Sequence, residues 1–212
     1  MKLLAICAVE AEAEACRSCE LLHVVVSGVG RTNAALATTR CVLESGPFDG
    51  VLSLGVAGAL PEVEPGLEIG DVVVATESIY HEEGIATPSG FKDMTALGFP
   101  LGDFEGNRIP AEAALLERFG ALGRCAAIAT VATCSGSDDS ALEVRRRTGA
   151  IAEAMEGAAV LHVAGALGLP ALEMRVISNT TGARDRQVWD LDQALDRLGD
   201  LVGRLGSLGE LH

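Results

Sequence analysis

Residues 153–189 read EAMEGAAVLHVAGALGLPALEMRVISNTTGARDRQVW, and this stretch decides the fold class. It places Met155 and Glu156 at the start of a predicted helix, and a predicted strand over residues 171–177 then ends in Ser178 and Asn179. Polar groups at helix starts and at the carboxyl ends of strands are where open α/β sheets bind their ligands. The stretch therefore predicts an α/β fold with a ligand site at one edge of its sheet.

Strands and helices alternate through the rest of the chain. Residues 2–9 form an uninterrupted apolar run, which predicts a strand covered on both faces, and further strands are predicted at residues 22–27, 50–54, 72–75 and 125–133. Capping and periodicity predict helices at residues 11–19, 32–43, 110–119 and 190–205, and one more that Asp138 or Asp139 caps. Residues 80–108 lack periodicity and indicate a long functional loop. The alternation, without linker or repeat, predicts one domain (1–212), a three-layer α/β/α sandwich around a mixed or mostly parallel sheet.

Composition limits the partners and the compartment. The formal net charge of −14 disfavours nucleic acid and anionic membranes, which would repel the chain, and leaves small neutral molecules open. The apolar run at residues 3–9 is too short for a membrane span or a convincing signal peptide, so we expect a cytoplasmic protein. The six cysteines favour reduced structural thiols, because Cys16 and Cys19 have no second ligand pair. We expect no metal and no cofactor.

Three polar residues, Glu12, Glu156 and Asn179, lie where the pattern predicts strand ends or helix starts, on three different connections between strand and helix. Each alone has a structural interpretation, since acids in a first helical turn complement the helix dipole and Asn is common in turns. Because all three converge on one sheet edge, together they predict a site. The turn at residues 28–31, GVGR, suggests dinucleotide binding, but Asn33 replaces the third glycine of that motif and a tight structural turn is favoured.

Five short motifs carry a resemblance to the purine nucleosidase and phosphorylase superfamily. They are AVEAE at residues 8–12, GVAG at 55–58, GDVV at 70–73, AME at 154–156 and RVISN at 175–179. The resemblance implies that Glu12 activates a water, that Glu156 binds ribose hydroxyls and that Met155 packs beneath the sugar. It also implies that the backbone at Thr133 and Cys134 faces the base, with the motif residues Gly58 and Ser178 at the substrate. This chemistry is sound, because carboxylates stabilise an oxocarbenium-like sugar and can deprotonate water.

Two longer stretches resemble the futalosine hydrolases of menaquinone biosynthesis within that superfamily. They are residues 83–91, EGIATPSGF, with LGF at 97–99, and residues 178–189, SNTTGARDRQVW. The resemblance implies a substrate loop containing Phe91 and a reaction that releases hypoxanthine from futalosine. Futalosine ends in a benzoate carboxylate, for which Arg184, Arg186 and Lys92 are candidate cations, although structural salt bridges are equally open. Ala183 departs from the acidic residue of the family pattern and leaves the fine role of that loop open.

Departures from the superfamily narrow the substrate. Adenosine-type nucleosidases carry Asp where this chain has Asn179, and an amide can donate to the oxygen of a 6-oxo purine. Ser53 and Val56 replace the Arg and Ser that bind phosphate in bacterial phosphorylases, which implies water as nucleophile. A methylthioadenosine/S-adenosylhomocysteine or inosine-type nucleosidase, and a non-catalytic purine-binding protein, remain alternatives; a pure binder would not need Glu12. We also expect a homodimer or higher homo-oligomer, formed by residues 80–108 and the leucines of the last helix.

Overall fold

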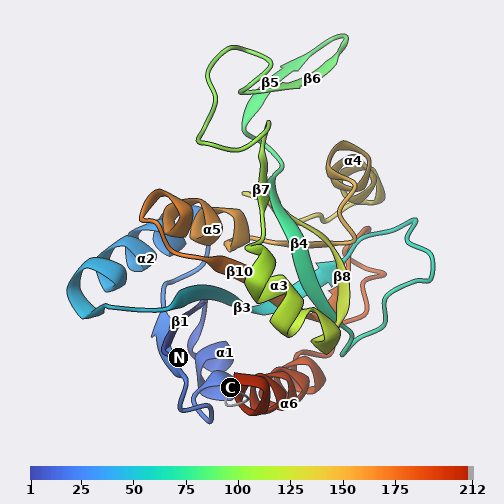
Figure 1. The fold of residues 1–212 in the computed structure, drawn as a ribbon. Helices are drawn as coiled ribbons and strands as arrows, with labels where there is room; N and C mark the ends of the chain where they lie inside the picture. The colour runs from blue at the N-terminus through green and yellow to red at the C-terminus, as the bar shows by residue number, and fades with distance from the viewer. Residues whose placement is uncertain (210–212) are drawn as a thin grey trace.

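A curled mixed sheet lies between two layers of helices in the computed structural model, which describes residues 1–209 (Figure 1). The strands are β1 (Leu3–Cys7), β2 (Leu22–Val26), β3 (Gly50–Ala59), β4 (Val72–Tyr80), β7 (Arg108–Pro110), β8 (Arg124–Thr130), β9 (Ala152–Ala154) and β10 (Ala171–Thr180). Their order is β10-β4-β8-β9-β3-β1-β2, with β7 beside β4. Because β10 also pairs with β3, five of these strands close into a ring. Parallel and antiparallel pairs both occur, which confirms the mixed sheet.

Helices cover both faces of the sheet. They are α1 (Glu10–Cys16), α2 (Arg31–Ser45), α3 (Ala113–Phe119), α4 (Asp138–Thr148), α5 (Gly157–Ala166) and α6 (Leu191–Gly209), with a 3₁₀ turn at Gly120–Leu122. Strand β1 is apolar at every position because it is buried on both sides: Leu3 and Ala5 pack toward α1, α3 and α6, whereas Leu4 and Ile6 pack toward α2 and α5. The three-layer sandwich predicted from the apolar runs is therefore confirmed.

The apolar seam of α6 is buried within the chain. Leu198, Leu201 and Leu205 are fully buried in the cluster that also contains residues of α1 and α3. These three leucines offer no surface to a partner, whereas Leu191 at the start of α6 is 45% exposed, so a contribution of this helix to an oligomer interface stays a prediction. Among the helices of residues 1–209, none is both long and apolar enough to cross a membrane.

Several elements differ from the sequence-based expectation. Strand β3 continues through residues 55–58 because these small residues stay extended. The predicted cap of α4 is also wrong, since Ser137 occupies that position and its Oγ accepts from the Ser140 N–H at 3.2 Å. The loop over residues 80–108 contains a hairpin, β5 (Gly84–Thr87) and β6 (Gly90–Asp93), that projects from the body (Figure 1).

Candidate active site

Glu12 lies in the first turn of α1, directly after β1, and is 97% buried. Its carboxylate accepts three backbone N–H groups: Oε2 from Ala8 at 2.8 Å and Val9 at 3.2 Å, and Oε1 from Val56 at 2.9 Å. Val9 is extended, so the chain turns sharply into the helix and directs the side chain back over the strand ends. These contacts hold a buried carboxylate in a fixed orientation, as a general base requires.

Glu156 occupies the N-cap position of α5, where its side chain makes no capping hydrogen bond, and is only 5% exposed. One oxygen, Oε1, accepts from the Gly30 N–H at 2.9 Å, and Oε2 lies 3.3 Å from the Met155 nitrogen. Gly30 has φ +93°, a conformation that a residue with a side chain rarely adopts, so the glycine of the β2–α2 turn is needed here. This turn therefore serves a carboxylate rather than a dinucleotide.

Arg175, on β10, lies next to both of these carboxylates. Its Nη2 lies 3.4 Å from Glu156 Oε2 and donates to Ser53 Oγ at 2.9 Å, and its Nε donates to Glu173 Oε1 at 2.8 Å. A Cβ at Gly55 would lie 2.3 Å from Glu12 Oε1 and 2.7 Å from Arg175 Nη1, so the guanidinium also adjoins Glu12. Burial alone would lower the pKa of Arg175, but its three carboxylate neighbours raise it above the ordinary value. The cation thus stays charged between the two candidate site carboxylates.

Glu173 anchors this network and is completely buried. It accepts from Ser78 Oγ as well as from Arg175. Burial raises the pKa of Glu173, while the guanidinium and the hydroxyl oppose that shift. Sequence reasoning missed the pair, although Glu173 and Arg175 interrupt an otherwise apolar strand at positions that share one face, which was a usable signal.

A pocket of about 260 Å³ opens near the end of β10, lined by Gly58, Cys134, Ser135, Gly136, Glu153, Asn179, Arg184, Gln187 and Trp189. Asn179 is held in place, because its Oδ1 accepts from Ser178 Oγ at 2.9 Å and its Nδ2 donates to the Thr180 carbonyl at 3.0 Å. One N–H of that amide remains for a ligand. A Cβ at Gly58 would lie 3.1 Å from Asn179 Nδ2, so glycine keeps this space open.

Cys134 and Met155 join the pocket to the buried carboxylates. Cys134 Sγ lies 3.4 Å from Met155 Sδ, and Met155 directly precedes Glu156. Burial raises the pKa of Cys134, with Glu153 and Glu156 adding to the shift, which favours the unreactive thiol. Thr133 is exposed beside Cys134. All six cysteines are free thiols, and residues 1–209 contain no cluster of His, Cys, Asp and Glu suited to a metal.

The remaining predicted site residues do not lie together. Arg184 lines the 260 Å³ pocket, where its guanidinium lies 4.8 Å from the centre of the Trp189 ring. Arg186 instead pairs with Asp138 on the surface. Phe91, on β6, lines a separate hollow of about 740 Å³ between the hairpin and α4, where the Arg147 guanidinium lies 4.2 Å from its ring centre. Lys92 follows it on the same exposed hairpin.

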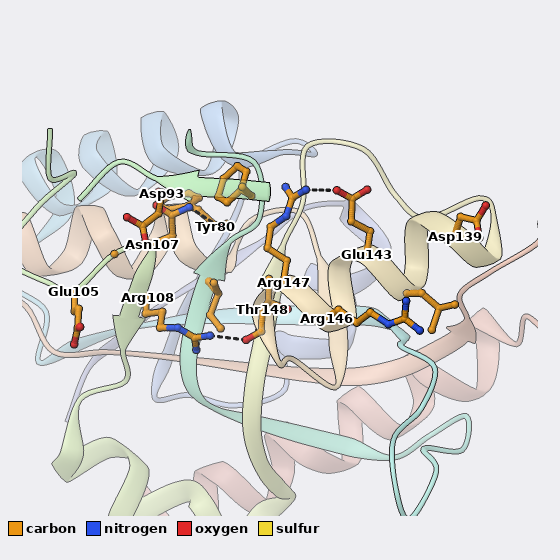
Figure 2. Close-up of a pocket in the computed structure, with 14 residues that line it drawn as sticks. Tyr80, Asp93, Glu105, Asn107, Arg108, Asp139, Glu143, Arg146, Arg147 and Thr148 are labelled. Carbon is orange, nitrogen blue, oxygen red and sulfur yellow. Dashed lines mark hydrogen bonds and ion pairs between the residues drawn. The ribbon is translucent and has the colours of Figure 1, made fainter. Parts of the chain in front are cut away.

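The larger hollow has a different chemistry from the candidate site. Figure 2 shows that the labelled residues of this hollow include both arginines and acids, among them Arg108, Arg147 and Glu143. Arg147 pairs with Glu143 one turn earlier on α4. It contains none of Glu12, Glu156 and Asn179. The structure therefore brings the three polar residues to the strand ends as expected, and places Phe91 elsewhere within the single chain.

Comparisons with known proteins agree with this fold. A family model described as the phosphorylase superfamily matches residues 19–207. The chain is 36% identical to a futalosine hydrolase of Streptomyces coelicolor, over 88% of this chain and 79% of the relative, and 34% identical to one of Thermus thermophilus, over 84% and 78%. The solved structure of futalosine hydrolase from Helicobacter pylori strain 26695 covers 100% of this chain and 98% of its own, with a TM-score of 0.79 at 21% identity. That likeness confirms the nucleosidase-like fold.

Proposed function

The chain belongs to the phosphorylase superfamily, and from this premise we propose that it hydrolyses the N-glycosidic bond of futalosine to release hypoxanthine and dehypoxanthine futalosine. One observation carries the proposal. Two buried carboxylates from different elements, Glu12 and Glu156, adjoin the single guanidinium of Arg175 at the ends of the strands. Such a pair can deprotonate a water and stabilise positive charge on a sugar, the two requirements of glycosidic hydrolysis.

In the proposed reaction the ribose lies against Glu156, and its vicinal hydroxyls donate to that carboxylate. A water held by Glu12 attacks C1′ as the bond to N9 breaks, and the bonding electron pair leaves with the purine. The proton lost by the water passes to Glu12, and the purine takes its own proton from solvent. Glu156 and Glu12 together stabilise the oxocarbenium-like charge that develops on the sugar.

Charge at the site supports water rather than phosphate as the nucleophile. Ser53 Oγ is buried and occupied by Arg175, and Val56 carries no polar side-chain atom. Arg175 is itself shared among Glu173, Glu156 and the neighbouring Glu12. An added phosphate would face these carboxylates with its nearest cation already paired, whereas a neutral water meets no such repulsion.

Asn179 supports a 6-oxo purine over the adenine of methylthioadenosine. Its free amide N–H can donate to the O6 of such a base. An adenine amino group at the position of O6 would face this donor and leave it unpaired, at a cost of about 1–3 kcal/mol. A non-catalytic purine binder would have no use for Glu12, whose carboxylate is held by three backbone donors.

The proposal extends to the assembly and the compartment. Leu36 and Leu43 are 66% and 70% exposed on one face of α2, and Phe99 is 69% exposed in the segment after the projecting hairpin. Apolar side chains this exposed favour burial against a second copy of the chain. We therefore propose a homodimer or larger homo-oligomer acting in the cytoplasm, in menaquinone biosynthesis.

The test is a substrate comparison with the purified protein. Futalosine, methylthioadenosine and inosine are each incubated with and without phosphate, and free base is quantified by chromatography. We expect hypoxanthine from futalosine at a rate that phosphate does not change, with much slower release of adenine. Faster cleavage of methylthioadenosine than of futalosine would contradict the proposal.

A further inference from the structure

Glu153 is a buried carboxylate that the mechanism above does not use. It lies on the short strand β9, is only 5% exposed and lines the 260 Å³ pocket. Strand pairing fixes its position: Asn179 on β10 is opposite Gly58 on β3, and Gly58 is opposite Glu153 on β9. Residues paired across neighbouring strands share a face of the sheet, so Asn179 and Glu153 face the pocket from either side of a glycine.

The space between these two side chains suits a planar base. Neighbouring strands lie about 4.8 Å apart, so the backbones that carry Asn179 and Glu153 are separated by roughly 9–10 Å. Gly58 itself places no side chain in that interval, and the side-chain atoms nearest to the Cβ that it lacks are Thr181 Cγ2 at 2.7 Å and Asn179 Nδ2 at 3.1 Å. Because no side chain at Gly58 separates them, Glu153 and Asn179 can converge on adjacent atoms along one edge of a flat bicyclic ring.

Contacts hold Glu153 as a hydrogen-bond acceptor. Oε1 accepts from the Ser135 backbone N–H at 2.7 Å, and Oε2 accepts from Ser135 Oγ at 2.6 Å. Each oxygen keeps a lone pair for a ligand. No ion pair within residues 1–209 neutralises this carboxylate, and its charged neighbour is another acid, Glu82. Burying a carboxylate without an ion pair costs folding free energy, and an amide side chain at position 153 could hold Ser135 equally well. The presence of an acid here therefore favours a ligand-binding role for Glu153.

We propose that Glu153 is a specificity-determining residue that accepts the N1–H of a 6-oxo purine while Asn179 donates to O6. This inference rests on the proposed function and names the atoms that select its base. Hypoxanthine presents an acceptor at O6 and a donor at N1, which complements an amide N–H beside a carboxylate. Adenine reverses both groups, so its N1 lone pair would face the carboxylate of Glu153 and its amino group the amide of Asn179.

Equilibrium binding of the free bases tests the assignment, because hypoxanthine and adenine have the same shape and opposite polarity. Dissociation constants are measured by calorimetry for the wild type, for Glu153→Gln and for Glu143→Gln, an exposed acid on α4 that serves as the control. The wild type should prefer hypoxanthine by about tenfold or more. An amide at 153 can donate as well as accept, so Glu153→Gln should cut that preference about tenfold, and the control should keep it.

Two results would overturn the proposal. If Glu153 only holds Ser135, Glu153→Gln leaves the affinities for both bases unchanged or alters them by the same factor, and their ratio stays at the wild-type value. Wild-type protein that binds adenine as tightly as hypoxanthine, or binds neither, rejects the assignment without any variant. Release of hypoxanthine from futalosine is measured separately. If futalosine is cleaved but Glu153→Gln leaves the ratio of the two dissociation constants unchanged, only the role of Glu153 is rejected. If Glu153→Gln changes that ratio but futalosine is not cleaved, only futalosine as the substrate is rejected.

Discussion

Replacing Glu12 by Gln is the sharpest perturbation of the proposed chemistry. The carboxylate accepts N–H groups from Ala8, Val9 and Val56, and it can still take up the proton of an attacking water. Glutamine keeps the shape and removes that capacity. Loss of a positioned general base lowers the rate about 10²–10⁴-fold, or about 2.7–5.4 kcal/mol of transition-state stabilisation. The amide nitrogen would also face a backbone N–H, which costs about 1–3 kcal/mol of folding stability.

Three measurements separate these effects. Hypoxanthine release from futalosine gives the rate, denaturant unfolding gives the stability, and calorimetry gives the affinity for hypoxanthine. Glu14→Gln is the matched control, because Glu14 is exposed on the same helix and pairs with Arg17. We expect Glu12→Gln to lose at least about 100-fold in rate while a folded population still binds hypoxanthine, and the control to change little. A folded Glu12→Gln protein with more than a tenth of the wild-type rate would refute the assignment of the base.

Four further outcomes are expected. Asn179→Asp should narrow or reverse the preference for futalosine over its adenine-bearing analogue, measured as kcat/KM, because a protonated carboxyl can donate to N7. Arg175→Gln leaves its buried carboxylates without a cation and should lower the free energy of unfolding by about 3–5 kcal/mol in denaturant titrations. Burial, with a smaller contribution from Glu82, raises the pKa of Glu153; the ionised carboxylate is the stronger acceptor for N1–H, so hypoxanthine affinity should fall as pH drops through that raised pKa. Sedimentation should show a dimer or larger assembly that Leu36→Glu weakens, and a fully active wild-type monomer would contradict this.

Much of the architecture could be predicted because segments that are buried in the fold are apolar in the sequence. Strand β1 is apolar at each position since helices cover both its faces, and α6 repeats its leucines with the period of a helix packed on one side. The positions of Glu12 and Glu156 could be predicted in the same way, because an acid directly after a buried strand or before a buried helix must lie at the sheet edge. Its limit appears in α6, where an apolar stripe alone could not distinguish packing on the sheet from packing on a partner.

The features that sequence missed depend on pairing between distant segments. Strand β9 has only three residues, too few to show a period, and it exists because β3 and β8 pair with it on either side. Glu153 therefore could not be placed beside Asn179 until both were found opposite Gly58. Phe91 was placed at the substrate by resemblance alone, whereas the hairpin that carries it projects away from the pocket in the single chain. Whether a partner copy brings it to the substrate stays a prediction.

The most direct test of the central claim, that water activated at Glu12 cleaves futalosine, is a product balance after complete turnover. Futalosine is incubated with the protein in phosphate-free buffer and again with added phosphate, and both products are quantified by mass spectrometry. We expect one hypoxanthine for each free, non-phosphorylated sugar product in both buffers. A sugar phosphate, or a requirement for phosphate before hypoxanthine appears, would contradict it.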